Sequence, residues 1–234
     1  ACCPPNLARL LSSIGSYAYT ENADTLFVHL YVGSVLTKKV EGQDADVCIE
    51  SGFPWNGNVK IRVRAKGSRF KLALRIPDWC GSYTVKGAET AGTRTMDGYL
   101  YVEKDWEEEE LIELCFPMEV RLMMANDNVR EDIGRVAVTR GPVVYCLEEA
   151  DNGKDLHLVS VEAASEPVVR DETVCQVPVK TIELSGSRQE KTEGQGLYRP
   201  WSAACKKPVR LKFIPYYMWA NRGENEMQVW TRAE

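Results

Sequence analysis

The sequence has little histidine and no excess of positive charge. Its 234 residues include 2 His, and 29 Lys and Arg stand against 34 Asp and Glu, so the formal net charge is -5. Proteins that bind nucleic acid phosphates carry a basic surface, so we expect no nucleic acid partner. No apolar run approaches the ~18 residues that a membrane helix needs, so we expect no membrane span.

The 8 cysteines also lack any paired spacing of the C-x-x-C kind that marks zinc fingers or small disulfide scaffolds. We therefore expect most of them to be buried thiols, namely Cys48, Cys80, Cys115, Cys146 and Cys175. Unpaired thiols favour a cytoplasmic location over a secreted one. The chain starts at Ala1 without Met or a signal-peptide pattern, so we expect the native N-terminus to lie upstream, where an export signal could stand.

Hydrophobic periodicity predicts a mainly β chain with one short helix at its start. After Pro4 and Pro5, apolar residues recur at three- and four-residue intervals, which predicts an amphipathic helix over 4–18. From Asp24 onward the period is two, and turn residues separate the strand-like segments. Many short strands without alternating helices favour two consecutive antiparallel β-sandwiches, with a polar junction near residue 126. The clearest expected strands are 25–32, 35–40, 58–65, 69–76, 98–103 and 111–116 in the first unit, and 135–139, 143–147 and 209–214 in the second.

The vicinal pair Cys2 and Cys3 is the first candidate site. Both sulfurs lie at a predicted helix start, where backbone N–H groups and the helix dipole favour a thiolate, which is both a nucleophile and a zinc ligand. Chance or packing explains an adjacent pair equally well. Zinc needs about four ligands. Glu113 and Cys115, on one side of a predicted strand, are candidates for the other two, although a surface position explains them better.

The remaining polar and aromatic candidates are weaker. His29 and His157 are read as strand residues that expose or hydrogen-bond their rings, and no Ser-His-Asp set can be assembled. Exposed aromatic rings can stack on sugars, but Trp79, Trp106, Trp219 and Trp230 fall in strand patterns and are expected to anchor cores. Only Trp55 and Trp201, in loops rich in Gly or Pro, are expected to be exposed.

Several phrases, taken together, resemble the bacterial β-L-arabinofuranosidases of glycoside hydrolase family 127. They run in order from residue 2 to residue 232. They are CCPPN at 2–6, FPWNG at 53–57, LRIPDW at 74–79, GYL at 98–100 with Trp106 beyond, GRVA at 134–137 with RGPVVY at 140–145, and IPYYMWANRG at 214–223.

The resemblance implies an (α/α)6 barrel that carries the active site and two β-sandwich domains that follow it. Residues 1–18 would be the last helix of a truncated barrel, 19–125 the first sandwich and 126–234 the second. In the family, three cysteines and a glutamate hold zinc, one of these cysteines is the nucleophile, and another glutamate is the acid/base. Cys2 would then be nucleophile and zinc ligand, and Cys3 a zinc ligand, while the other site residues would precede Ala1.

On this resemblance the chain is the accessory region of a retaining, Zn-thiolate glycosidase that acts on terminal arabinofuranosides. The parent would bind zinc and a carbohydrate substrate, whereas this fragment is expected to bind no zinc and to be inactive alone. A homodimer through the second sandwich is expected. The alternatives are a non-catalytic carbohydrate-binding or interaction module and, less favoured, a redox protein that uses Cys2 and Cys3.

Overall fold

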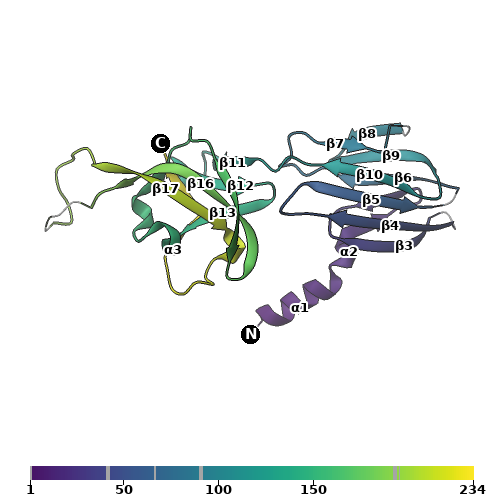
Figure 1. Ribbon diagram of the computed structural model, residues 1–234, viewed down its shortest axis with the longest axis horizontal. Coiled ribbons are helices and arrows are strands. Elements are labelled where there is room, and N and C mark those ends of the chain that lie inside the picture. Colours follow the sequence, from purple (N-terminus) through teal and green to yellow (C-terminus); the bar gives the residue numbers. More distant parts are fainter. Residues whose placement is uncertain (1, 41–42, 66, 90–91, 192–193, 195) are drawn as a thin grey trace. The chain divides into compact units, whose positions relative to one another are not determined.

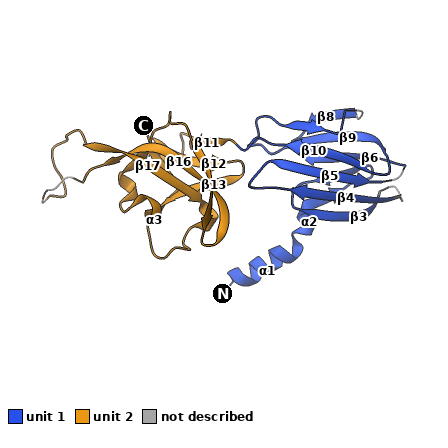
Figure 2. Cartoon of the chain, in the orientation of Figure 1, with its two compact units in different colours: residues 1–118 blue, residues 119–234 orange. Residues whose placement is uncertain are grey.

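The computed structural model describes residues 2–40, 43–65, 67–89, 92–191, 194 and 196–234 (Figure 1). The chain forms two compact units, Ala1–Met118 and Glu119–Glu234 (Figure 2). This division falls earlier than the junction near 126, because strand β11 (Val120–Met123) pairs with β12 (Arg135–Arg140) of the second unit. None of the helices among the described residues has the length and apolar character needed to cross a bilayer.

The expected N-terminal helix is present but interrupted. Helix α1 spans Cys3–Ser13 and α2 spans Gly15–Ala18, with a turn at Ile14 between them. The hydroxyls of Ser12 and Ser13 donate to the carbonyl of Arg9, at 2.9 Å each, a side-chain-to-backbone contact that weakens helix continuity, and Gly15 follows. No residue of α1 is buried, so its apolar stripe (Leu7, Leu10, Leu11, Ile14 and Tyr17, counting α2) faces outward.

The first unit is a sandwich of two five-stranded sheets. Sheet I has the order β1-β2-β6-β9-β8 and sheet II the order β3-β4-β5-β10-β7. All pairings are antiparallel except that of β2 with β6. The strand bounds are β1 Tyr19–Glu21, β2 Thr25–Val28, β3 Ser34–Val40, β4 Gln43–Ser51, β5 Asn58–Arg64, β6 Ser68–Arg75, β7 Thr84–Lys86, β8 Gly92–Met96, β9 Tyr99–Trp106 and β10 Glu110–Cys115.

Alternation along the strands builds the core between the sheets. On β5 the residues Val59, Ile61 and Val63 are fully buried while their neighbours face outward, as a two-residue period requires. Phe70 on β6 stacks on Trp106 of β9 with ring centroids 5.3 Å apart, and the Trp106 indole N–H donates to the Phe70 carbonyl at 3.0 Å. The acidic run at 105–110 would by itself suggest a solvated turn over its whole length, but Trp106 ends one strand in the core and Glu110 begins the next, so the turn is confined to 107–109.

The second unit is one nine-stranded sheet, in which six strands pair in a closed ring. The circuit runs β12-β19-β14-β16-β17-β13 and returns to β12, with β11, β15 and β18 attached to it. The pairing of β14 with β19 is parallel. The remaining bounds are β13 Val143–Glu148, β14 Val159–Val161, β15 Val168–Val174, β16 Val177–Gln189, β17 Lys206–Pro215, β18 Met227–Gln228 and β19 Thr231–Ala233, with short helices η1 Arg130–Asp132, α3 Glu149–Asn152, η2 Leu156–Leu158 and η3 Tyr216–Met218.

The core of this unit lies inside the circuit and is made of aliphatic and aromatic residues from most of its strands. Tyr145, Leu147, Ile182 and Phe213 are all fully buried there. The prediction of a mainly β chain with two consecutive antiparallel β-sandwich domains behind a short helix is confirmed, with two additions: the pairings of β2 with β6 and of β14 with β19 are parallel, and the sheet of the second unit closes on itself.

Candidate functional site

The paired thiols lie where the sequence places them, at the start of α1. Cys2 is the N-cap residue and Cys3 the first helical residue, and both are exposed. Their Sγ atoms are 3.7 Å apart. Pro4 and Pro5 follow directly and carry no N–H, so the helix start offers the sulfurs fewer backbone donors than an ordinary first turn does. The peptide dipole remains to favour negative charge there.

The spacing of the two sulfurs fits two ligands of one zinc ion. A Zn–S bond is about 2.3 Å, so two thiolates at a tetrahedral centre lie roughly 3.8 Å apart. The observed separation needs almost no adjustment. Among the residues that the structure describes, however, no group of three or more His, Cys, Asp or Glu side chains is placed to hold a metal ion. The pair by itself would supply two of the about four ligands that a zinc site needs.

Glu113 and Cys115 do not complete that site. Both lie on β10 and alternate with the buried residues Ile112 and Leu114. Their side chains are therefore on the side of the strand away from the core. The Glu113 carboxylate lies 3.8 Å from the Lys60 ammonium across the sheet. Their suggested role as the other two zinc ligands is wrong, because the strand uses them as part of its solvent-facing surface.

The prediction for the histidines holds only in part: the His29 ring is hydrogen-bonded, but His29 lies just after β2 and not in a strand. The two ring nitrogens of His29 contact the hydroxyls of Thr20 (2.6 Å) and Tyr99 (2.7 Å). Burial, together with the positive charge of Arg75, lowers the pKa of His29, so its ring stays neutral at neutral pH. His157 lies in η2 rather than in a strand, and its carbonyl accepts a hydrogen bond from Arg232.

The other cysteines and the tryptophans follow expectation only in part. Of the five thiols expected to be buried, only Cys146 is, and burial raises its pKa to about 12. Trp201 is 91% exposed, as predicted, but Trp55 is half-buried. Trp219 was expected in a core and is 40% exposed, stacked on Tyr216 with ring centroids 6.0 Å apart.

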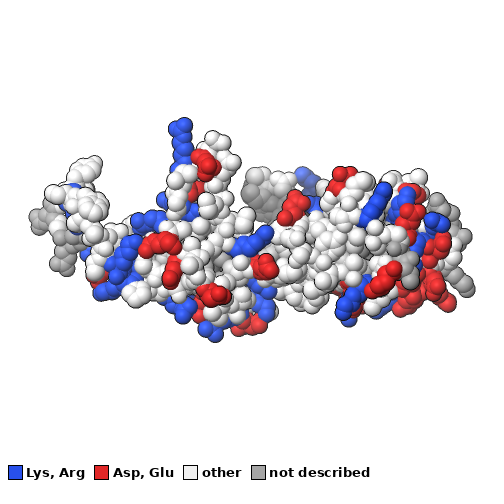
Figure 3. Space-filling view, turned by 90° about the horizontal axis from the view of Figure 1, so that it is seen from above, with Lys and Arg blue, Asp and Glu red and all other residues white. Residues whose placement is uncertain are grey.

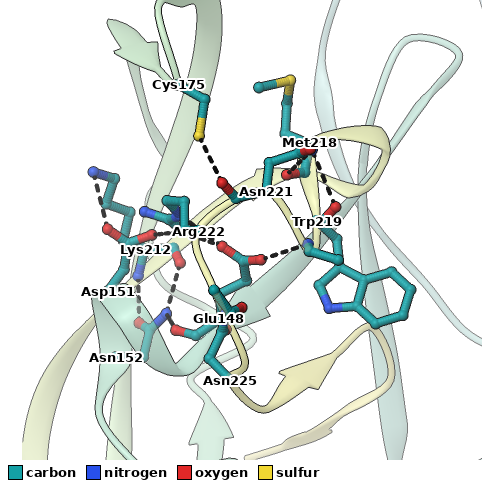
Figure 4. A network of polar contacts seen from close by, with 12 residues as sticks. Glu148, Asp151, Asn152, Cys175, Lys212, Met218, Trp219, Asn221, Arg222 and Asn225 are labelled. Carbon is teal, nitrogen blue, oxygen red and sulfur yellow. Dashed lines mark hydrogen bonds and ion pairs between the residues drawn. The ribbon is translucent and has the colours of Figure 1, made fainter.

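A network of charges around one buried carboxylate, which sequence reasoning missed, holds the loop after β17 (Figure 4). The Glu148 carboxylate, at the end of β13, has no exposed surface. It accepts from Nε of Arg222 at 2.8 Å and from the backbone N–H of Ala220 at 3.2 Å. A second carboxylate, Asp151 on α3, accepts from the same guanidinium at 2.5 Å.

Neighbouring groups complete this network. Lys212 on β17 lies 3.3 Å from Asp151 and 2.6 Å from Glu172 on β15. Burial alone would raise the pKa of Asp151, but Arg222 and Lys212 outweigh it and the pKa lies below its ordinary value. Ala220 and Arg222 belong to the phrase at 214–223, so that phrase supplies the loop side of the network.

Charges elsewhere on the surface are mixed in sign. On the face seen in Figure 3, basic and acidic side chains alternate over both units. Many are paired, for example Arg64 with Glu109 at 2.8 Å and Lys206 with Glu234 at 2.6 Å. Such intermixing is typical of a solvated surface and does not form an electrostatic footprint on that face.

Comparison with known proteins covers almost the whole chain. Residues 25–118 match the middle domain of β-L-arabinofuranosidases of glycoside hydrolase family 127 (GH127), and residues 120–232 match the family's C-terminal domain. The non-reducing end β-L-arabinofuranosidase of Bifidobacterium longum subsp. longum is 35% identical to this chain over 99% of the chain and 37% of that protein.

Two solved structures have the same fold. The crystal structure of a GH127 β-L-arabinofuranosidase from Geobacillus stearothermophilus T6 matches with a TM-score of 0.91 and 38% identity, over 100% of this chain and 38% of that one. A second GH127 β-arabinofuranosidase matches with a TM-score of 0.86 and 31% identity, over 100% of this chain and 39% of that one. The chain thus spans less than two fifths of the length of these relatives.

The two β domains match, in the same order, two domains of a glycoside hydrolase family. More narrowly, the chain belongs to glycoside hydrolase family 127, of which it carries the middle and C-terminal domains.

Proposed function

We propose that this chain is the C-terminal region of a glycosidase that releases terminal arabinofuranosyl residues, with Cys2 as its nucleophile. The observation that carries the proposal is the pair of exposed sulfurs, 3.7 Å apart, at the helix that leads into family 127 middle and C-terminal domains. In this proposal Cys2 and Cys3 are two zinc ligands, and the other ligands and the acid/base glutamate belong to the longer parent enzyme.

The exposed stripe on α1 supports the placement of residues 1–18 at the end of a helical domain. Leu7 is 58% exposed, Leu10 51% and Leu11 60%. A helix with an apolar stripe owes most of its stability to packing of that stripe. We therefore assign α1 to the catalytic domain of the parent and the strands of both units to accessory sandwiches.

The proposed chemistry assigns one role to each thiol. The Cys2 thiolate attacks the anomeric carbon, forming a C–S bond as the bond to the leaving oxygen breaks, and an acid outside this chain protonates that oxygen. Water then attacks the anomeric carbon and gives its proton to the conjugate base of that acid, while the sulfur leaves as a thiolate, so that two displacements give net retention. Cys3 helps to orient the site as the second sulfur ligand. Bound zinc would stabilise the thiolate form of both cysteines. The chain alone lacks the acid and is inactive in this proposal.

Replacement of the nucleophile tests this proposal. In the parent enzyme, Cys2→Ser should lower kcat/KM on an arabinofuranoside on the order of 10³-fold or more, as the loss of a nucleophile does. Cys175→Ser removes another exposed thiol and should leave kcat/KM unchanged. Elemental analysis of the reduced 234-residue chain should find no stoichiometric zinc. Stoichiometric zinc that disappears with Cys2→Ser would mean instead that this chain completes the metal site itself.

The alternative of a non-catalytic carbohydrate-binding module keeps two supporting observations. Trp201 is 91% exposed and Trp219 40% exposed, and indole faces suit sugar rings. This reading needs no contribution from Cys2 and Cys3, whose spacing then has no function. We rank it second for that reason.

We also propose that the second unit mediates a homodimer. Strand β15 pairs among the described residues with β16 only, which leaves its other edge open, and Val168 and Val169 on it are 37% and 39% exposed. An open edge with apolar side chains is suited to pairing with another chain. Charge on that edge should block association.

In light scattering at micromolar concentration, Val169→Lys should raise the dimer dissociation constant at least about tenfold. Val144→Lys, at a 40% exposed position on β13, is the matched control and should leave the dimer intact. A monomeric unsubstituted chain would overturn the dimer.

A further inference from the structure

The two outer faces of the first sandwich differ in chemistry. On sheet II, charged side chains pair across neighbouring strands: Arg62 with Glu50 at 3.3 Å and with Glu109 at 3.2 Å, and Lys60 with Glu113 at 3.8 Å. Rows of such pairs are typical of a sheet face that water covers.

The outer face of sheet I carries ion pairs at one end, Arg69 with Glu103 at 3.5 Å and Lys71 with Asp24 at 2.5 Å, but its larger part carries aromatic rings. Phe27 on β2 packs edge-on against Tyr99 and Tyr101 on β9, with centroids 5.6 and 6.2 Å apart. His29 lies 5.7 Å from Tyr99 in the same geometry. The Arg94 guanidinium on β8 lies over the Tyr101 ring at 5.2 Å. Together with Met96, which is opposite Tyr99 in register, these residues form what we call the aromatic face.

The register explains how rings from two strands meet. Phe27 and Tyr101 both lie opposite Ala73 of the intervening strand β6. Ala73 points outward yet has no exposed surface, because its small side chain lets the two rings close over it. The four rings of the aromatic face are half-buried, so each keeps part of its surface outward. Aromatic residues, Met and Arg are the residues enriched where proteins contact other protein surfaces.

The chain path identifies what would cover this face. Helix α2 runs directly into β1, the edge strand beside β2, and the backbone N–H of His29 donates to the carbonyl of Ala18 at 2.8 Å. The polypeptide thus enters sheet I next to the aromatic face. The segment that enters, α1 with α2, itself exposes an apolar stripe. The aromatic face and the apolar stripe of α1 are thus two exposed surfaces that are close together along the chain. The relatives are much longer than this chain, which covers 37% and 38% of two of them.

We propose that in the parent enzyme the aromatic face of sheet I is the docking surface for the preceding, helical part of the same polypeptide, while sheet II faces water. This inference rests on the proposed function, since it requires that a larger catalytic domain precedes α1. Arg75 and Arg94 are exposed on this face, so the covering surface should offer carboxylates together with apolar side chains. The contact would fix the accessory sandwich against the domain that holds the rest of the site.

Oxidation of methionine by hydrogen peroxide tests this docking without any substitution. Met96 on the aromatic face and Met123 on β11 are both 42% exposed, so they should form sulfoxides at similar rates in the 234-residue chain. In the parent enzyme, peptide mass spectrometry should find Met96 oxidised at least about tenfold more slowly than in the isolated chain. Met124, 76% exposed, reports that the oxidant reaches the protein.

The outcomes separate the two proposals. An unchanged Met96 rate in a parent that hydrolyses arabinofuranosides would overturn the docking and leave the proposed function standing. A protected Met96 in a parent without that activity would support the docking and count against the function. Protection of Met96 in the isolated chain by added arabino-oligosaccharides would overturn the docking in favour of a sugar-binding face.

Discussion

Arg222→Ala should lower the free energy of unfolding of the second unit by about 3–5 kcal/mol. The reason is the Glu148 carboxylate, which has no exposed surface and loses its cationic partner when the guanidinium is removed. An uncompensated buried charge costs more than the ion pair itself contributes. Asp151 loses the same partner, although Lys212 remains 3.3 Å away.

Urea unfolding of the 234-residue chain would measure this loss. Arg170→Ala is the matched control, because Arg170 also pairs with a carboxylate, Glu183 at 2.9 Å, but is 52% exposed. That change should leave the free energy of unfolding nearly unchanged, because solvent-exposed ion pairs contribute little to stability. Adding Glu148→Gln to Arg222→Ala removes the stranded charge and should recover part of the loss. Equal costs for Arg222→Ala and Arg170→Ala would contradict the account.

Gly57→Ala should destabilise the first unit by about 3 kcal/mol or more, near the upper end of single substitutions. A Cβ built on Gly57 would lie 1.8 Å from the carbonyl oxygen of Phe116. That neighbour is backbone, held by a hydrogen bond from its own N–H to the Gly57 carbonyl at 3.0 Å, so it cannot rotate away. The substitution must therefore separate the segments at Gly57 and Phe116, and the Phe116 ring packs in the core against Tyr31 and Phe53.

The control for this prediction is Gly33→Ala, where the nearest atom to a new Cβ is the Ile49 carbonyl oxygen at 3.8 Å. That contact is ordinary, so the free energy of unfolding should change by less than about 1 kcal/mol. Urea midpoints of the two variants make the comparison. If Gly57→Ala and Gly33→Ala unfold alike, the close approach of the chain at Gly57 is not a constraint.

Strands with regular alternation could be predicted from the sequence, and irregular ones could not. The apolar positions of β5 and β6 recur every two residues, and both strands lie within one residue of their predicted bounds. Strand β16 is not among the predicted strands, and Gly186 with its polar neighbours is more typical of a loop than of a strand. There the glycine is a packing requirement, since a Cβ would lie 2.3 Å from the Ser160 carbonyl oxygen on β14.

The same limit holds for the sites. Cys2 and Cys3 are adjacent in sequence, so their closeness needs no fold and could be predicted. Glu148 and Arg222 come together only because the end of β13 faces the loop after β17, and nothing in either local sequence indicates that contact. Trp219 follows η3 rather than lying in a strand, which explains why a strand-based reading placed its exposed ring in a core.

The closed circuit of the second unit also sets an order of events during protein synthesis. Strand β12 is the first strand of the circuit along the chain. One of its edges stays unpaired until β19, the last strand of the unit, has been synthesised. The first unit, by contrast, has its last strand at β10, before the second unit begins. Because domains generally fold from the N-terminal side as they leave the ribosome, the first sandwich can be complete while the ring is still open. The nascent second unit must therefore keep Tyr145, Leu147 and the rest of its inner face from aggregating until β19 emerges.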